Sequence, residues 1–400
     1  MEMKSMNRLL LKNGKVALEK EIINKGFIYI EGNKIIDIGN LDSLPSLSKD
    51  IQVIELPEEY ISVPGFIDLH IHGAGGADTM DATTEALSTM SGILPAEGTT
   101  SFLATTITQE IKSIEDALKN VANYRKHHNE AGEAEILGIH LEGPFINEKR
   151  AGAQPVEHIL APDIDLFKRW QELAENGIKL VTMAPEQENG LEFVRYLDQS
   201  GVVASIGHSD ATYEETVKAV DAGAKHVTHL FNGMRGLHHR EPGIAGAALL
   251  LKQLMVEIIA DGIHVCPEMI QLSLQTKGTD RMILITDSMR AKCLKNGTYD
   301  LGGQDVTVKD GKALLENGTL AGSILKMKDS IQNMIQFTGI SLLEAIQLAS
   351  VNPAKQMGVY DRKGSLAPGK DADIVILDEN NEVFTTFCRG KLAYKKGGEN

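Results

Sequence analysis

Two histidines one residue apart, His70 and His72, end an apolar run that begins at Gly65. Such a run is typical of a buried strand, and alternate side chains of a strand point to the same side. The two imidazoles therefore project together from the C-terminal end of the strand, where they suit a divalent metal such as Zn²⁺ or Fe²⁺. An isolated pair of this kind also occurs as ordinary polar residues at a strand end, so the rest of the chain has to decide between the two interpretations.

The central part of the chain alternates short apolar runs with helical segments. We predict helices over residues 109–127, 212–222 and 267–275, among others. This alternation indicates parallel βα units, and eight of them predict an α/β fold, a (β/α)₈ TIM-like barrel with its active site at the C-terminal ends of the strands. The eight predicted strands cover residues 66–72, 100–105, 136–142, 179–184, 202–207, 226–229, 256–260 and 282–286.

Both ends of the chain consist of short strand-like runs separated by Gly and Asn turn signals. Neither end is long enough to bury a core of its own. We therefore predict that residues 1–62 and 362–400 combine into one small β-sandwich domain, and that residues 63–361 form the barrel. After the eighth strand, residues 294–318 are predicted to form a hairpin insertion, and residues 325–337 and 342–348 to form two helices.

Composition limits the class of partner. The 400 residues carry a formal net charge of −15, which argues against a nucleic-acid or anionic-membrane partner. No apolar run approaches the roughly 20 residues that span a bilayer, and the first 15 residues are too weakly apolar for a secretory signal. The three cysteines, Cys266, Cys293 and Cys388, form no C-x-x-C motif. We expect free thiols in the cytoplasm and a metal held by nitrogen and oxygen ligands.

Six of the eight predicted strands end in a residue that can bind a metal or transfer a proton. A carboxylate in an apolar strand is costly to bury without a partner, so Glu142 is predicted to bind a metal, and it can bridge two metals from between two histidine pairs. Asp287 is placed to accept a proton from an attacking water. His140 is either a ligand or a hydrogen-bond partner of one, and His226 is expected to be a packed core residue. The strand-end residues are His70, His72, His140, Glu142, His208, His229, Asp261, His264 and Asp287.

Eight sequence motifs extend over nearly the whole chain. They are PGFIDLHIH (64–72), HLEGPF (140–145), GHSDA (207–211), THLFNGM (228–234), REPG (240–243), DGIH (261–264), GTLAGS (318–323) and LAPGKDAD (366–373). In this order they resemble the amidohydrolase superfamily and, more narrowly, the N-acetylglucosamine-6-phosphate deacetylase family. The resemblance implies a metal-dependent hydrolase that converts N-acetyl-D-glucosamine 6-phosphate to D-glucosamine 6-phosphate and acetate in amino-sugar metabolism.

The resemblance also implies roles for individual residues. Glu142, His208 and His229 would hold the main divalent metal, with His70 and His72 completing a site for one or two ions of Zn, Fe or Mn. Asp287 would be the catalytic acid/base. His264 would contact the substrate and polarise the acetamide carbonyl. The sugar pocket would be lined by Ala153, Asn232, Gly233, Leu320, Ala321 and Gly322.

The phosphate would be bound by Arg240, in this family reaching in from the second subunit of a homodimer. His239, Lys149 or Arg150 could add positive charge there. Gln154 stands where some family members carry a histidine, so the role of this position stays open. Two other functions remain: another amidohydrolase, such as a cyclic-amide hydrolase or an aminoacylase, or a non-catalytic barrel that serves as a scaffold. A pocket without a phosphate requirement would favour the first, and an absence of bound metal the second.

Overall fold

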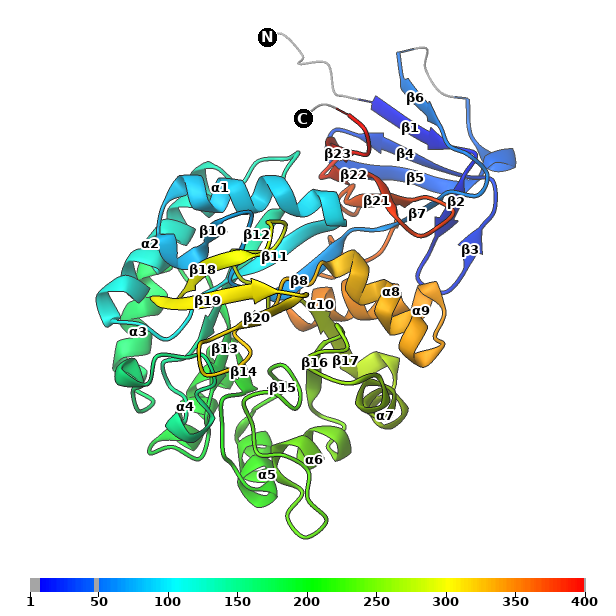
Figure 1. The fold of residues 1–400 in the computed structure, drawn as a ribbon. Helices are drawn as coiled ribbons and strands as arrows, with labels where there is room; N and C mark the ends of the chain where they lie inside the picture. The colour runs from blue at the N-terminus through cyan, green and yellow to red at the C-terminus, as the bar shows by residue number, and fades with distance from the viewer. Residues whose placement is uncertain (1–7, 47–49, 399–400) are drawn as a thin grey trace.

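The computed structural model describes residues 8–46 and 50–398, and a barrel of eight parallel strands forms its centre (Figure 1). All eight predicted strands are confirmed, each within two residues at either end. Their order around the barrel follows the sequence. The strands are β8 (Phe66–Ile71), β11 (Thr99–Thr105), β12 (Glu135–Glu142), β13 (Ile178–Met183), β14 (Val203–Ile206), β15 (His226–Val227), β16 (Met255–Ile259) and β17 (Met282–Ile285).

The barrel nearly closes where β17 meets β8. The backbone N–H of Asp287 donates to the carbonyl of His70 at 2.8 Å, and the N–H of His72 donates to the carbonyl of Ser288 at 2.9 Å. Below them, the buried Asp68 carboxylate accepts the hydroxyl of Thr286 at 2.5 Å. These bonds hold the first and last strands together at the end where the predicted site residues lie.

Helices cover the outside of the barrel. Helices α3 (Ile164–Leu173) and α4 (Gly190–Gln199) each present an apolar side to the strands: Phe167 and Trp170 of α3 and Phe193 and Leu197 of α4 are buried in a single cluster with strand residues such as Leu141. The other helices are α1 (Thr84–Ile93), α2 (Ile111–His127), α5 (Tyr213–Ala222), α6 (Gly243–Leu250), α7 (Pro267–Lys277), α8 (Met327–Thr338), α9 (Leu342–Ile346) and α10 (Asn352–Gln356).

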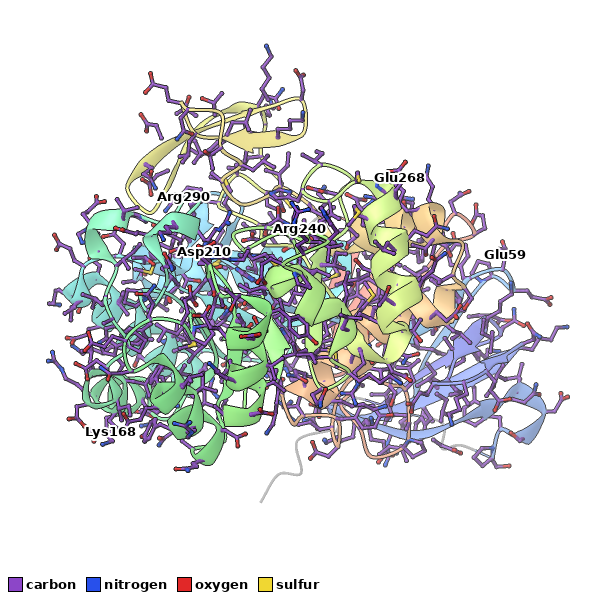
Figure 2. The ribbon with its side chains drawn as sticks, turned by 90° about the horizontal axis from the view of Figure 1, so that it is seen from below. Glu59, Lys168, Asp210, Arg240, Glu268 and Arg290 are labelled. Atoms are coloured by element: carbon purple, nitrogen blue, oxygen red, sulfur yellow. The ribbon has the colours of Figure 1, made fainter. Side chains whose placement is uncertain are left out.

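The predicted insertion after the eighth strand is a three-stranded antiparallel sheet rather than a simple hairpin. It consists of β18 (Gly297–Leu301), β19 (Gln304–Lys309) and β20 (Lys312–Leu314). In Figure 2 this sheet projects beyond the helices, on the same side of the barrel as Arg240. The turn between β18 and β19 is therefore able to reach the rim of the barrel.

Strands from both chain ends form two further sheets. The four-stranded sheet has the order β5-β4-β1-β6 and the six-stranded sheet the order β23-β22-β21-β7-β2-β3. Leu11 and Ile28 of the first sheet share a buried cluster with Ile374 and Phe387 of the second, so residues from both ends build one core. The strands are β1 (Arg8–Lys12), β2 (Lys15–Ala17), β3 (Ile22–Ile23), β4 (Gly26–Glu31), β5 (Lys34–Asn40), β6 (Gln52–Glu55), β7 (Ile61–Pro64), β21 (Ile374–Leu377), β22 (Val383–Cys388) and β23 (Lys391–Lys395).

The domain boundaries at residues 62/63 and 361/362 stay a prediction, and residues 1–7, 47–49 and 399–400 of the predicted sandwich lie outside the described residues. In the described part of the chain, no helix is both long enough and apolar enough to cross a bilayer.

An ion-pair network joins the first residue of β12 to the segment that returns to these sheets. Glu135 contacts Arg362 at 2.7 Å and Lys363 at 2.7 Å. Lys363, whose side chain is 1% exposed, also pairs with Asp373, and Arg362 pairs with Asp371 at 2.7 Å. The network lies at the start of β12, opposite the strand end that carries Glu142.

Candidate active site

Glu142, the last residue of β12, lies at the centre of a cluster of four histidines from the ends of three other strands, β8, β14 and β15. Its Oε1 atom is 3.1 Å from Nε2 of His208, 3.2 Å from Nε2 of His229 and 3.3 Å from Nε2 of His70. Its Oε2 atom is 3.2 Å from Nε2 of His72. The four histidines predicted as metal ligands therefore converge on the carboxylate of the fifth, Glu142, which is 2% exposed.

Asp287 contacts the two histidines of this cluster that lie at the end of β8. Its Oδ1 atom lies 3.4 Å from Nε2 of His70 and 3.3 Å from Nε2 of His72. Two of the three groups with metal-ligand spacing in the described residues result, one of Glu142, His208 and His229 and the other of His70, His72 and Asp287; the third joins His70 to His140 and Glu257. Because Glu142 contacts histidines of both groups, the arrangement has the form of two adjoining cation sites that share a carboxylate.

The donor set fits a divalent cation. Within the described residues, Nε2 of His70 is buried and has no hydrogen-bond partner, which is costly unless a cation or proton satisfies it. Burial lowers the pKa of His72, but Asp287 and Glu142 raise it to about 9. Burial raises the pKa of Glu142, but the charge of His70 and the histidine hydrogen bonds hold it well below its usual range. The carboxylates thus draw positive charge into the cluster. Imidazole and carboxylate donors without a thiolate suit Zn²⁺, Fe²⁺ or Mn²⁺.

Hydrogen bonds fix the orientation of the imidazoles. Nδ1 of His208 bonds to the Arg150 carbonyl at 2.8 Å, and Nδ1 of His229 bonds to the Asn232 carbonyl at 3.1 Å. In both rings this leaves Nε2 facing Glu142. Partners of this kind set the tautomer and direction of a metal-binding histidine.

Glu257, on β16, was not predicted as a site residue, but it contacts three histidines beneath the cluster. Its carboxylate bonds to Nδ1 of His70 at 3.1 Å, to Nε2 of His226 at 3.0 Å and to the backbone N–H of His229 at 3.2 Å. His226 is fully buried, as predicted for a core residue, and Glu257 is its partner. Glu257 is a carboxylate inside an apolar strand, the same signal that drew attention to Glu142.

His140 is hydrogen-bonded through both of its ring nitrogens, which favours a supporting role over metal binding. Its Nδ1 bonds to the Leu69 carbonyl at 3.1 Å and its Nε2 to the hydroxyl of Thr182 at 2.7 Å. Burial and the charge of His70 lower the pKa of His140 to about 3, so the ring is neutral. Both ring nitrogens are thus occupied by neutral partners.

Three site residues have left-handed backbone conformations. The φ angle is 46° at His208, 26° at His229 and 47° at Asp287. Such values are unfavourable for residues other than glycine, and they concentrate at functional sites. Gly233 has a φ of 55°, and a Cβ atom there would lie 3.0 Å from Nδ1 of His208. The absence of a side chain at this position therefore leaves room for the His208 ring.

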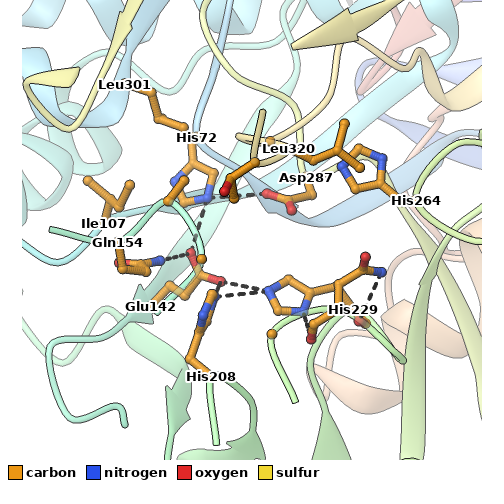
Figure 3. Close-up of a pocket in the computed structure, with 16 residues that line it drawn as sticks. His72, Ile107, Glu142, Gln154, His208, His229, His264, Asp287, Leu301 and Leu320 are labelled. Atoms are coloured by element: carbon orange, nitrogen blue, oxygen red, sulfur yellow. Dashed lines mark hydrogen bonds and ion pairs between the residues drawn. The ribbon is translucent and has the colours of Figure 1, made fainter. Parts of the chain in front are cut away.

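A cavity opens over the cluster, and Figure 3 shows the residues that line it. It contains five of the predicted substrate-binding residues besides His264: Ala153, Asn232, Gly233, Leu320 and Gly322. Ala321 is fully buried in an apolar cluster beside the cavity instead of lining it. Ile107, Gly152, Gln154, Leu301 and Thr319 also line the cavity, and none of them was predicted as a site residue. Ile107 lies in a loop and Leu301 in the predicted insertion, and nothing in the sequence indicates that either residue reaches the cavity.

His264 faces the cavity from the loop after β16, supported by Asp261. Nδ1 of His264 lies 2.6 Å from the Asp261 carboxylate, whose other oxygen accepts the backbone N–H of His264 at 2.8 Å. Burial lowers the pKa of His264, but the hydrogen bond and charge of Asp261 outweigh burial and raise it. His264 lines the cavity, and the charged form of its ring would suit the stabilisation of a developing oxyanion there.

Asp210 connects the loops around His208. Its carboxylate pairs with Arg150 at 2.8 Å and with Arg235 at 2.8 Å, and its backbone carbonyl accepts a hydrogen bond from Arg235 at 2.7 Å. The carbonyl of Arg150 accepts the hydrogen bond from the His208 ring, so the pairs that Asp210 makes also fix the position of this predicted ligand. The Arg150 guanidinium is thus held by Asp210, whose single negative charge is shared between Arg150 and Arg235.

Gln154 contacts the central carboxylate directly. Its Nε2 donates to Oε2 of Glu142 at 2.8 Å, and its Oε1 accepts the backbone N–H of Thr108 at 2.8 Å. The amide therefore ties Glu142 to the loop after β11. This gives the position a supporting role, which the sequence left open.

Arg240 does not line the cavity of its own chain. It lies in an exposed loop, and its guanidinium contacts Nε2 of His239 at 2.8 Å (Figure 2). The structure thus brings together all the predicted metal and acid/base residues and most of the sugar-pocket residues, and leaves Arg240 apart from them.

Comparisons with known proteins identify the family of the chain. The profile of the Amidohydrolase family matches residues 61–393. The N-acetylglucosamine-6-phosphate deacetylase of Bacillus subtilis (strain 168) is 49% identical over 387 residues, which cover 96% of this chain and 97% of the relative. The enzyme of the same name from Lysinibacillus sphaericus is 47% identical over 82% of this chain and 84% of the relative.

A solved structure shows the same fold. The N-acetyl-D-glucosamine-6-phosphate deacetylase of Mycobacterium smegmatis, a mutant in complex with N-acetyl-D-glucosamine 6-phosphate, superimposes with a TM-score of 0.90 at 32% identity. The match covers 97% of this chain and 100% of that one.

Proposed function

This chain belongs to the amidohydrolase family, and within it to the N-acetylglucosamine-6-phosphate deacetylases, and we propose that the cluster around Glu142 is its hydrolytic centre. Its reaction is the hydrolysis of N-acetyl-D-glucosamine 6-phosphate to D-glucosamine 6-phosphate and acetate in amino-sugar metabolism. The observation that carries the proposal is the convergence of four histidines on one buried carboxylate, with Asp287 in contact with two of them, in a cavity at the strand ends.

We assign the main metal to Glu142, His208 and His229, and a second position to His70 and His72. A divalent ion of Zn, Fe or Mn bound there supplies Lewis acidity, which polarises the acetyl carbonyl and acidifies the attacking water. The two-ion arrangement is supported by the contacts of Glu142 with both groups of histidines: Oε1 lies near His208, His229 and His70, and Oε2 lies near His72. Glu257 and Gln154 would hold these ligands in place.

Asp287 is the proposed general base and general acid. Its carboxylate borders the cavity between His72 and the side of the pocket that carries His264 (Figure 3). Burial raises the pKa of Asp287, but His70 and His72 outweigh it and lower the pKa, so the carboxylate is ionised and able to take a proton from water. The same group then delivers that proton to the departing amine. His264, held by Asp261, would donate to the carbonyl oxygen as negative charge develops on it.

The sugar would lie against Ala153, Asn232, Gly233, Leu320 and Gly322, which line the cavity. Arg240 would bind the 6-phosphate through its guanidinium, which suits bidentate contact with phosphate. Because Arg240 is exposed and lies outside its own cavity, we propose that it acts on the cavity of a second subunit in a homodimer. We also propose that the protein acts in the cytoplasm. Its three cysteines are free thiols, which a reducing compartment favours.

Acetate release tests this function. The purified chain should release acetate from N-acetylglucosamine 6-phosphate, lose the activity after chelation and regain it when Zn²⁺ or Mn²⁺ returns. Unphosphorylated N-acetylglucosamine should react far more slowly, because Arg240 would then lack its ligand. Equal rates with the two sugars would favour another amidohydrolase, and undiminished turnover after verified metal removal would refute the metal-dependent centre.

A further inference from the structure

One wall of the cavity is apolar, although most groups around it are polar. Ile107 and Leu301 form this wall, and each is only 2% exposed. Both belong to a buried cluster with Met289, Val306 and Ala321. In Figure 3 the two side chains lie on the side of the cavity that carries His72 and Gln154, whereas Leu320 lies between this side and His264.

Hydrogen bonds tie Ile107 closely to the central carboxylate. The residue after Ile107, Thr108, donates its backbone N–H to Gln154 at 2.8 Å, and Gln154 donates to Glu142 at 2.8 Å. The position of Ile107 relative to Glu142 is therefore set by two consecutive bonds. This places the apolar wall at the end of the cavity where the metal ligands are.

The insertion sheet holds Leu301 in the same wall. Gln304, at the start of β19, donates to the Ala153 carbonyl at 2.6 Å, and Gln109 donates to the Gly302 carbonyl at 2.8 Å. A Cβ atom on Gly302 would lie 3.2 Å from Ile107, so the β18–β19 turn packs directly on it. The wall is thus pinned from two sides and has little room to retreat.

We propose that Ile107 and Leu301 receive the methyl group of the N-acetyl substituent and limit the length of the acyl group that the enzyme removes. The inference rests on the proposed function of the Glu142 cluster. The methyl is bonded directly to the carbonyl carbon, which has to lie beside Asp287 and the metal ligands. The hydroxyl and phosphate groups of the sugar need polar partners, and burying a hydroxyl against isoleucine and leucine would leave it without a hydrogen bond.

A fixed apolar wall discriminates by size. An acyl chain that is one methylene longer has to displace packed side chains, and a methylene difference in an apolar pocket changes kcat/KM by about 10- to 200-fold. The wild-type enzyme should therefore prefer N-acetyl- over N-propionyl-glucosamine 6-phosphate by at least about tenfold. The N-butyryl compound should be a poorer substrate still.

The test measures kcat/KM for these three substrates with wild-type enzyme and with Ile107→Ala, Ile107→Val, Leu301→Ala and Leu320→Ala. We expect Ile107→Ala to reduce the acetyl-to-propionyl preference by about tenfold or more, and Ile107→Val to reduce it less. Leu320→Ala is the matched control from the same cavity: it should alter KM but leave the preference nearly unchanged. If Ile107→Ala does not fold, as judged by circular dichroism and metal content, Ile107→Val and Leu301→Ala still report on the wall.

The proposal is overturned if wild-type enzyme shows no preference between the acyl groups. It is equally overturned if the folded wall variants keep the wild-type preference, or if Leu320→Ala changes it as strongly as Ile107→Ala does. Failure of the proposed function has a different signature, because wild-type enzyme would then release no carboxylic acid from any of the three substrates.

Discussion

Replacing Glu135 with glutamine should destabilise the protein by an amount that depends on pH. Burial raises the pKa of Glu135, but the hydrogen bonds and charges of Arg362 and Lys363 outweigh burial and lower it from 4.5 to about 2. A shift of this size corresponds to about 3 kcal/mol of stability near pH 7. The side chain is 11% exposed, so solvent screens the pairs only weakly. Lys363 keeps Asp373 as a partner in the variant, so about 3 kcal/mol is an upper value.

The pH dependence has a definite sign. A carboxylate with a depressed folded pKa contributes its full stability above its unfolded pKa, and the contribution is lost as pH falls through the folded pKa. For Glu135 the loss begins near pH 4.5 and extends toward pH 2. The wild-type advantage over Glu135→Gln should therefore fall from about 3 kcal/mol at pH 7 to about 2 kcal/mol at pH 3.5.

Urea denaturation of both proteins at pH 7, 5 and 3.5 measures this difference, because pH effects common to the two chains cancel. Glu58→Gln is the matched control. Glu58 lies 3.4 Å from Lys25, but both side chains are more than 60% exposed, so this variant should lose less than about 0.5 kcal/mol. A Glu135→Gln loss no greater than that of the control, or one that does not shrink toward pH 3.5, would refute the reasoning.

Three further substitutions test the site. Asp287→Asn should lower kcat by about 10²- to 10⁴-fold while metal content, measured by elemental analysis, stays at the wild-type value; near-wild-type turnover would exclude the proton-transfer role. Asp210→Asn loosens the contacts that hold the His208 ring and should weaken metal affinity or activity by about 10- to 100-fold, whereas unchanged metal titrations and kinetics would show that these contacts are dispensable. Asp261→Asn removes the charge that raises the pKa of His264, so the alkaline limb of the kcat profile should move to lower pH; a limb that stays in place would separate His264 from that titration.

The barrel was predictable because its strands are buried on both faces and read as continuous apolar runs. The rim residues were predictable because parallel strands deliver their C-terminal residues to one end of a barrel. His70, Glu142, His208 and His229 could thus be grouped although up to 159 positions separate them, from 70 to 229. The strand pattern therefore predicts which residues lie at the same end of the barrel, whereas the distances between their side chains come only from the folded structure.

Contacts between loops were not predictable in this way. Nothing in the sequence indicates that Gln154 bridges Thr108 and Glu142, or that Arg150 turns to Asp210, because these pairs depend on loop paths and not on strand periodicity. Glu257 was missed for another reason: its strand ends in an Asp and a His that drew the attention, although a carboxylate among apolar strand residues needs a partner wherever it lies.

The order of strands in the two terminal sheets was likewise beyond the sequence. Short strands of similar composition pair in several orders with little difference in local preference, and β7 pairs with β21 across more than 300 residues. The insertion was expected as a hairpin, but a third strand, β20, pairs with β19 and completes a sheet. These outcomes depend on tertiary packing, which local propensity does not encode.

The location of the metal is the claim on which the hydrolytic account depends. Crystals grown with Zn²⁺ and measured at the zinc absorption edge would show the ion directly by its anomalous scattering. The account predicts a peak bonded to Glu142, His208 and His229 at about 2.0–2.2 Å from each ligand atom. Zinc bound only elsewhere, with these three side chains free of metal in crystals of active enzyme, would contradict it.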